Sequence, residues 1–374
     1  MALLPLVAAA CGSGQGAPKV GMAYTTGGDA LLRFFQAEVD RARAEGAPAV
    51  RIVGFEEDPA GADDSPLAAE VRRAERFVAD PDVLVAIGPG GSREVLQVAP
   101  IFREAGMMQI VPTATSRALR QAGDHTFLLS PDDSLQGVFL GAFADTALGA
   151  RRAAIFYVPD EYGIGLASGT AAALAARGVR LLGRTPVGAT NDCGTPAGRL
   201  RFRDFAEELA LGGRPDVIVL AMRTVQSGCL AAALVARFPD VGLLAGDGTY
   251  LGEPFFARAG AAASSTYVVH FWDPGGPDER SRRFAAAFEA AVGRTVRHGD
   301  AMFHDALMLA VQAIREAGQD RAAVRRYLTE VGRSRPAFDG ITGPIGHGAH
   351  QKRRMLMLRA SERRGAGTRA EATR

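Results

Sequence analysis

Short apolar runs alternate along the chain with longer segments in which apolar residues recur every three or four positions. The runs at residues 20–24, 83–87 and 108–111 each end at a turn and are followed by helical spacing. Apolar runs bounded by Gly and Pro are typical of strands buried in a parallel sheet. The alternation therefore predicts an α/β fold in which helices cover parallel sheets.

The alternation continues after residue 150 as a second series. Its expected strands cover residues 153–158, 179–187, 217–222, 241–245 and 267–272. Helical spacing is found near residues 203–211, 225–237, 279–292, 301–317 and 321–331. The pattern predicts two consecutive α/β blocks that meet near residues 127–133, with the last helices packing on one of them.

The composition fits a soluble globular protein, with 374 residues of which 47% are hydrophobic and 22% charged. At roughly 150 residues per domain this length predicts two domains. The formal net charge is +2, yet eight basic and only two acidic residues lie from Lys352 onward. Residues 361–374 have almost no large apolar residue and are expected to form a basic, disordered tail. Because no aromatic residues interleave with these arginines, nucleic-acid binding is not expected.

The N-terminus carries an apolar stretch, residues 1–10, that ends in three alanines before Cys11. It resembles a bacterial lipoprotein signal, in which Cys11 is diacylated and becomes the mature N-terminus, and residues 12–18 are linker-like. A ragged N-terminus with an incidental cysteine is the alternative. No other segment approaches the ~18 apolar residues of a membrane span. In an exported protein, Cys193 and Cys229 are a candidate disulfide pair.

Two turns that follow expected strands carry small and hydroxyl-bearing residues. Ser92 ends the turn after residues 83–87, and Thr113-Ala114-Thr115 follows residues 108–111. Ligands of open α/β sheets bind at the carboxyl ends of the strands. Free backbone N–H groups and a Ser or Thr hydroxyl at that edge hold a carboxylate without a buried positive charge. The two turns therefore predict a binding site for a carboxylate.

Motifs that would indicate an enzyme or a cofactor are absent from the sequence. Residues 88–91 lack the spacing of a dinucleotide loop, and there is no GxxxxGK[ST] phosphate loop. There is also no Gly-x-Ser-x-Gly elbow. His347 and His350 lie in a Gly-rich loop without acidic or thiol neighbours. Neither a cofactor nor a metal is expected.

Six segments together resemble one known family. They are AIGPGGS at 86–92, IVPTAT at 110–115, FLLSPDDSLQG at 127–137, YVPDEYGIGLA at 157–167, AGDG at 245–248 and FDGITGP at 338–344. In this order and spacing they resemble the leucine/isoleucine/valine-binding proteins, the type 1 periplasmic solute-binding proteins that serve ABC importers.

The resemblance implies two Rossmann-like lobes with parallel-type sheets, joined by a three-segment hinge. The resulting division expects residues 19–128 and 253–335 in the first lobe and residues 129–252 and 336–360 in the second. Residues 1–18 would be the lipoprotein signal and tether.

The resemblance also implies roles for individual residues. Ser92 and Thr115 match residues that bind the α-carboxylate of an amino acid, and Thr113, next to Ala114, matches a backbone contact to the ligand. Tyr162 matches an aromatic residue of the second lobe that closes over the ligand. Asp247 matches the acidic partner of the α-ammonium. The alternatives are a helix cap at Ser92, ordinary turn residues at Thr113, Thr115 and Asp247, and a solvent-facing Tyr162.

Arg223 stands where relatives often have an aromatic residue after a strand. If it faces the cleft, it favours a ligand with an acceptor or anionic side group over leucine. A solvated arginine at the lip of the cleft is the alternative. Tyr24, Phe271 and Trp272 are the candidates for an apolar wall.

The function expected from the sequence is that of a lipid-anchored receptor at the periplasmic side or outer cell surface. It would be a monomer that binds a small carboxylate-bearing solute, an amino acid or a related compound, and presents it to an ABC permease. A ligand-sensing regulatory protein of the same fold, of the amide-responsive type, is an alternative, as is a diverged α/β enzyme.

Overall fold

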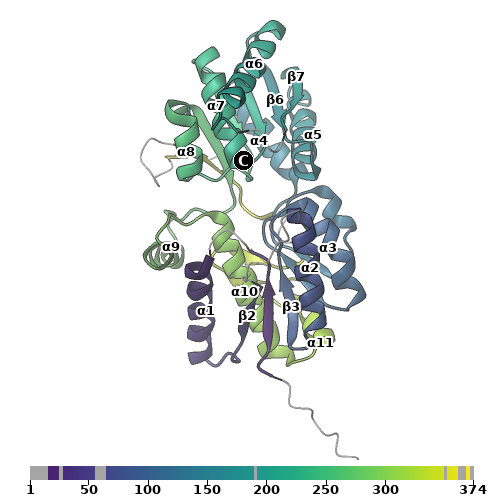
Figure 1. Ribbon diagram of the computed structural model, residues 1–374. Helices are drawn as coiled ribbons and strands as arrows, with labels where there is room; N and C mark the ends of the chain where they lie inside the picture. Colours follow the sequence, from purple (N-terminus) through teal and green to yellow (C-terminus); the bar gives the residue numbers. More distant parts are fainter. Residues whose placement is uncertain are drawn as a thin grey trace, which may run out of the picture.

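The computed structural model describes residues 16–24, 28–54, 65–188, 192–348, 352–360 and 368–370. These residues form two α/β lobes, one above the other in Figure 1. Cys11 and most of the expected tether lie outside the described residues. None of the helices in the described parts of the chain combines the length and the apolar character of a membrane span.

The first lobe is built on a five-stranded parallel sheet with the order β2-β1-β3-β4-β5. The strands are β1 (Lys19–Met22), β2 (Arg51–Val53), β3 (Val83–Ile87), β4 (Met108–Val111) and β5 (Thr126–Leu128). Every residue of β3 and β4 is buried, which accounts for the apolar sequence of β3 and for three of the four residues of β4. The fourth, Gln109, donates from Nε2 to the carbonyl oxygen of Gly88 at 2.9 Å.

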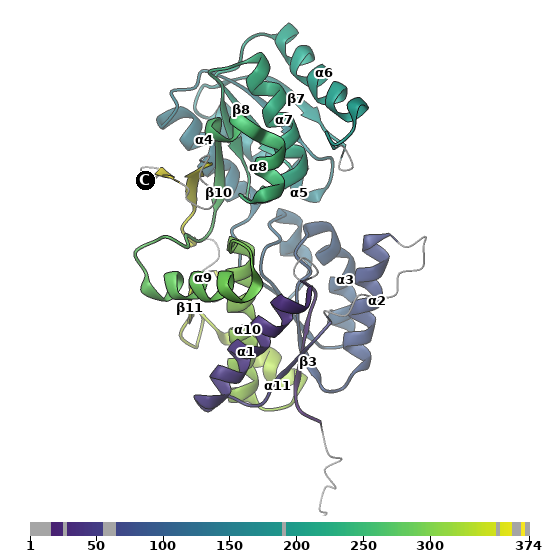
Figure 2. The ribbon, with the colours of Figure 1, turned by 60° about the vertical axis from the view of Figure 1, so that its left-hand side comes forward.

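Helices cover both faces of this sheet. They are α1 (Gly28–Ala44), α2 (Pro66–Ala79), α3 (Ser92–Glu104), α9 (Glu279–Val292), α10 (His298–Ala317) and α11 (Arg321–Glu330). Helix α1 packs against α9 and α10, while α2 packs against α3 on the other side (Figure 2). The short 3-10 helix η1 (Arg117–Gln121) follows β4.

The second lobe has a seven-stranded sheet with the order β14-β13-β10-β9-β8-β6-β7. Its strands are β6 (Arg152–Tyr157), β7 (Arg180–Pro186), β8 (Val217–Ala221), β9 (Gly242–Ala245), β10 (Thr266–His270), β13 (Leu356–Arg359) and β14 (Thr368–Ala370). The first five pair in parallel, and β13 and β14 are antiparallel additions. The helices are α4 (Asp133–Thr146), α5 (Glu161–Ala175), α6 (Pro196–Gly212), α7 (Thr224–Arg237), α8 (Glu253–Ala259) and the 3-10 helix η2 (Gly260–Ser265).

The order of the described strands and helices requires three crossings between the lobes. The chain crosses between β5 and α4, between β10 and α9, and between β12 (Gly343–Ile345) and β13. Strand β12 forms a two-stranded hairpin with β11 (Phe338–Gly340). The predicted fold class, two α/β lobes with mostly parallel sheets, is confirmed.

Two of the expected lobe boundaries, and part of the expected tail, differ from the structure. Residues 253–270 belong to the second lobe, because β10 is hydrogen-bonded between β9 and β13. The hairpin at residues 338–345 packs on the first lobe instead, since Asp305 of α10 accepts the backbone N–H groups of Ile341 and Thr342. Within the expected disordered tail, Thr368–Ala370 forms β14 against β13. Backbone pairing at a sheet edge needs no large apolar side chains.

A glycine shapes the turn after β3. Gly88 has φ +86°, and a Cβ there would lie 2.6 Å from the carbonyl oxygen of Ala23. Only a residue without a side chain fits this left-handed conformation and close approach. The turn that leads to Ser92 therefore leaves the sheet directly beside the end of β1.

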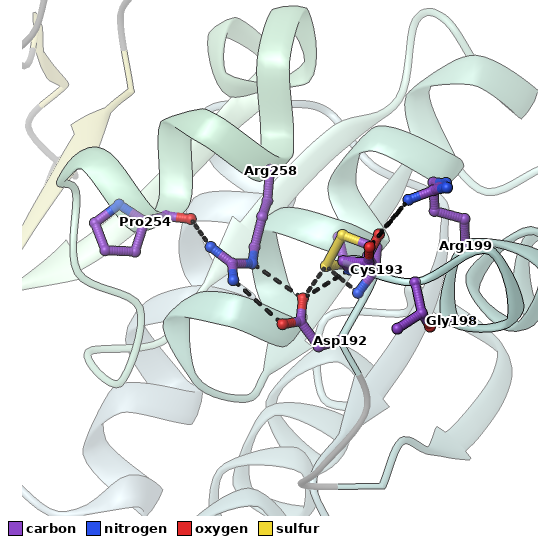
Figure 3. The surroundings of a disulfide bond; sticks show 9 residues. Asp192, Cys193, Gly198, Arg199, Pro254 and Arg258 are labelled. Atoms are coloured by element: carbon purple, nitrogen blue, oxygen red, sulfur yellow. Dashed lines mark hydrogen bonds and ion pairs between the residues drawn. A yellow bond between two sulfur atoms is a disulfide. The ribbon is translucent and has the colours of Figure 1, made fainter.

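The candidate cysteine pair forms a disulfide. Cys193, just before α6, is bonded to Cys229 of α7, with their Cα atoms 5.6 Å apart. Beside it, Asp192 accepts hydrogen bonds from Nε and Nη2 of Arg258 at 3.1 and 3.2 Å (Figure 3). The disulfide anchors the segment before α6 to α7, the helix whose first residues lie at the cleft described next.

Candidate functional site

A cleft of about 590 Å³ lies between the lobes. All seven predicted ligand-binding residues line it: Ser92, Thr113, Ala114, Thr115, Tyr162, Arg223 and Asp247. Those of the first lobe follow β3 and β4, and those of the second follow β6, β8 and β9. The carboxyl ends of parallel strands from the two sheets thus face each other across the cleft.

On the first-lobe wall, Ser92 holds the neighbouring turn. Ser92 is the first residue of α3, and its Oγ accepts the backbone N–H groups of Thr115 and Ser116 at 3.3 and 3.1 Å. The helix cap is Gly91, so the side chain of Ser92 does not serve as the cap. Thr113 Oγ1 donates to the carbonyl oxygen of Gly90 at 3.0 Å.

This arrangement suits an anion. With its Oγ accepting two N–H groups, Ser92 can direct its own O–H proton toward a ligand. The first N–H groups of α3 have no intrahelical partner, and the helix dipole adds partial positive charge there. Around Ser92, the first-lobe wall therefore offers donors without a full positive charge.

On the second-lobe wall, Asp247 is held by a glutamine. Nε2 of Gln136 donates to Asp247 Oδ1 at 2.9 Å, and the backbone N–H of Asp247 donates to Gln136 Oε1 at 3.3 Å. Asp247 is only 4% exposed. Burial raises its pKa to about 6, while hydrogen bonds from Gln136 and Tyr162 act in the opposite direction.

Tyr162 lies beside Asp247 and is buried, not solvent-facing. Its hydroxyl oxygen accepts the backbone N–H of Gly248 at 2.9 Å. Burial, with the charge of Asp247, raises the pKa of Tyr162 well above its ordinary value. The phenol therefore stays protonated and is a donor at neutral pH.

A second buried carboxyl group, Asp133, was not singled out as a site residue from the sequence. It is the first residue of α4 and is fully buried, and its Oδ2 has no hydrogen-bond partner within the described chain. Burial and then the charge of Asp247 raise its pKa well above the usual range. The only sequence signal was the helix start, where Asp132 supplies the cap and Asp133 follows it.

Arg223 lies at the cleft but already has a counter-charge. Its Nη1 is 2.6 Å from Asp160 Oδ2, and its guanidinium lies 5.9 Å from the centre of the Tyr162 ring. Its side chain is 42% exposed, so the residue occupies the rim. The sequence left open whether Arg223 faces the cleft or is solvated at its lip. In the structure Arg223 lines the cleft and is also partly exposed at its rim.

Only one of the three candidates for an apolar wall lines the cleft. Tyr24 does so, with its ring stacked on Phe303 at 4.0 Å and its hydroxyl donating to Asp300 at 2.7 Å. Phe271 and Trp272 are buried elsewhere, and Trp272 Nε1 donates to Ser281. The expectation for these two residues was wrong because the chain leaves β10 into the interior beside α9.

Six other polar residues line the cleft that no sequence pattern indicated. They are Glu70, Glu94, Thr224, Gln226, Tyr250 and Arg297. Arg297 immediately precedes α10, and its guanidinium lies 5.4 Å from the centre of the Tyr250 ring. No motif marked these two positions, because they meet only through the crossing between β10 and α9.

A family model described as periplasmic binding protein matches residues 21–363. A leucine-binding protein, LivK, from Thermotoga maritima is 18% identical, with a TM-score of 0.77 over 95% of this chain and 98% of that one. LivJ from Streptococcus pneumoniae, solved with isoleucine, is 19% identical, with a TM-score of 0.76 over 95% and 100%. A solute-binding protein from R. palustris, solved with 4-hydroxybenzoate, is 17% identical, with a TM-score of 0.76 over 95% and 96%.

An amino acid binding protein from Pseudomonas aeruginosa is 30% identical over 108 residues, which is 29% of each chain. The match therefore spans less than a third of that curated relative. At their identities, the solved structures show a shared fold alone. The family model, by contrast, covers most of the sequence. The chain belongs to the periplasmic binding protein family and has the fold of the type 1 solute-binding proteins.

Proposed function

We propose that this protein is the extracytoplasmic solute receptor of an ABC importer and that it binds a small carboxylate-bearing solute, an amino acid, between its lobes. The observation that carries the proposal is the pairing of two walls. The first lobe presents hydroxyl and N–H donors around Ser92, and the second presents the buried carboxyl group of Asp247.

The two walls match the two charges of an amino acid. A zwitterion removed from water needs hydrogen bonds or a counter-charge at both ends. Ser92, Thr115 and the N-terminus of α3 would receive the α-carboxylate. Asp247, with the hydroxyl of Tyr162 beside it, would receive the α-ammonium.

Closure follows from this division of contacts. A ligand shifts an equilibrium only through its different affinity for the two states. The first-lobe contacts exist in the open and closed forms alike, whereas those with Asp247 and Tyr162 require closure. The closed form is then the state that a membrane permease recognises. A monomer held at the membrane through diacylated Cys11, at the periplasmic side or outer cell surface, completes the proposal.

Similarity to proteins of known ligand supports the amino-acid assignment, since LivJ was solved with isoleucine and the relative from P. aeruginosa is an amino acid binding protein. Three tyrosines also line the cleft, Tyr24, Tyr162 and Tyr250, and the relative from R. palustris was solved with an aromatic carboxylate. An aromatic acid, which has no ammonium group, is therefore the second candidate ligand.

A thermal-shift screen of amino acids, amides and aromatic acids tests the proposal, followed by calorimetry on the compounds that bind. Ligand at 100 times its dissociation constant adds about 2.7 kcal/mol of stability. We expect an amino acid to bind, and Ser92→Ala and Asp247→Asn to weaken it. Leu211→Ala, at a residue that is 91% exposed at the end of α6, is the control. Binding of aromatic acids alone, unaffected by Asp247→Asn, contradicts the amino-acid assignment.

A further inference from the structure

The charged groups of the cleft are unequally compensated. Arg223 pairs with Asp160, and Glu70 pairs with Arg73 at 2.6 Å. Glu94 lies in the first turn of α3, whose dipole favours an acidic residue, and its charge also reaches Arg223. Each of these charges thus has an opposite charge or dipole nearby.

Arg297 differs from them. Throughout the described residues it forms no ion pair with a carboxylate, and its guanidinium faces the ring of Tyr250. The nearest acidic residue along the chain, Asp300, is occupied by Arg294 through two bonds of 2.7 and 2.8 Å and by the hydroxyl of Tyr24. Asp300 also accepts the backbone N–H of Arg297 at 2.8 Å, which holds this residue at the start of α10.

Tyr250 completes the same part of the wall from the second lobe. Its backbone N–H donates to Thr224 Oγ1 at 2.9 Å, and its ring contacts that of His298 at 5.3 Å between centroids. Burial raises the pKa of Tyr250, so the hydroxyl remains a donor. Burial lowers the pKa of His298 to about 3, so this imidazole is neutral at physiological pH. The positive charge beside the ring of Tyr250 is therefore that of Arg297.

These groups lie close to both ends of the proposed amino-acid site. A Cβ on Gly299 would be 3.4 Å from the Tyr250 hydroxyl and 3.6 Å from Thr113 Cγ2, so Tyr250 and the carboxylate turn approach the same backbone. Tyr250 is three residues from Asp247, at most about 10 Å along an extended chain. An amino acid whose α-ammonium lies at Asp247 therefore needs only a short side chain to reach Tyr250.

We propose that Arg297 and Tyr250 form a second anion subsite and that the solute is an acidic amino acid whose side chain ends in a carboxylate. This inference rests on the proposed function. Closure removes water from Arg297, and a charge left without a partner in such a place is costly. A side-chain carboxylate supplies that partner. A leucine side chain would displace the water around Arg297 without offering a hydrogen-bond acceptor in its place.

Calorimetry with L-glutamate, L-glutamine and L-leucine tests the inference on the wild type, Arg297→Met and Tyr250→Phe. Arg315→Met, an exposed arginine near the other end of α10, is the matched control. We expect glutamate to bind the wild type at least about 10-fold more tightly than glutamine or leucine. Arg297→Met should weaken glutamate by about 10- to 100-fold, as a charged hydrogen bond predicts, and leave leucine unchanged. Tyr250→Phe should weaken glutamate by a few fold.

The outcomes separate the inference from the function beneath it. If glutamine or leucine binds as tightly as glutamate, or Arg297→Met weakens all three equally, the second subsite is refuted while amino-acid binding stands. If none of the three binds and no other amino acid does, the proposed function fails and the inference fails with it. Melting curves of each variant without ligand establish that the protein is folded.

Discussion

Replacing Asp247 with asparagine is expected to stabilise the unliganded protein at neutral pH. Burial raises the pKa of Asp247 from 3.8 to about 6. At 1.36 kcal/mol per pKa unit, ionising this buried group costs the folded protein about 3 kcal/mol relative to the unfolded chain. Asparagine has nearly the same shape and retains an oxygen for the hydrogen bond from Gln136, so the variant avoids this cost.

The sign of the pH dependence follows from the direction of the shift. Between pH 3.8 and about 6 the folded protein binds more protons at Asp247 than the unfolded chain does. Its stability therefore falls as the pH rises through this window, and the full cost is present above pH 6. The advantage of Asp247→Asn should be about 3 kcal/mol at pH 7.5, about 1.5 kcal/mol at pH 5 and near zero at pH 3.5.

Urea unfolding of both proteins at these three pH values measures the effect. Asp240→Asn is the control, because the Asp240 side chain is 84% exposed and its ion pair with Arg214 is at the surface. It should change stability little at any pH. Equal stability of wild type and Asp247→Asn at pH 7.5, or a gain that does not vary with pH, would refute the reasoning from burial.

Three further predictions concern other parts of the fold. Ser92→Ala should weaken amino-acid binding about 10- to 100-fold by calorimetry, since it removes a donor and leaves two buried N–H groups unpaired; unchanged affinity would contradict its role. Cys229→Ser, which frees Cys193, should cost about 2–4 kcal/mol in urea unfolding, and a reductant should then destabilise only the wild type. Gly137→Ala should lower the melting temperature measured by circular dichroism, because its Cβ would lie 2.3 Å from the carbonyl carbon of Gly169; an unchanged melting temperature would show that α4 and α5 separate without cost.

The strands and their carboxyl-terminal turns were predictable because local pattern determines them. The buried runs of β3 and β8 are apolar throughout, β4 has Gln109 as its one polar residue, and polar turns follow all three strands. Ser92 and Asp247 follow such strands, and parallel strands bring their carboxyl ends to one edge. The position of these residues at the cleft was therefore accessible from sequence, whereas the ligand-binding role remains a prediction.

The remaining parts depend on contacts between distant segments. The apolar run of β10 does not reveal which sheet it joins, and α8 has only seven residues, too few for a clear helical period. The expected boundary at residue 253 therefore lies before β10, whereas the chain returns to the first lobe only after β10. Arg297 and Tyr250 are 47 residues apart and belong to different lobes, so only the crossing of the chain brings them together.

The cost of ionising Asp247 connects stability to closure in the proposed function. This carboxylate is desolvated, and within the described parts of the chain it has hydrogen bonds but no ion pair. An ammonium group carried by a solute on the first-lobe wall supplies that charge only when the lobes close. Recovering about 3 kcal/mol in the closed state alone would shift the open-to-closed ratio by a factor of roughly 100. The first-lobe contacts add affinity in both states and therefore do not shift this ratio. The solute would drive closure by supplying the counter-charge to Asp247, a buried carboxylate whose ionisation destabilises the folded protein.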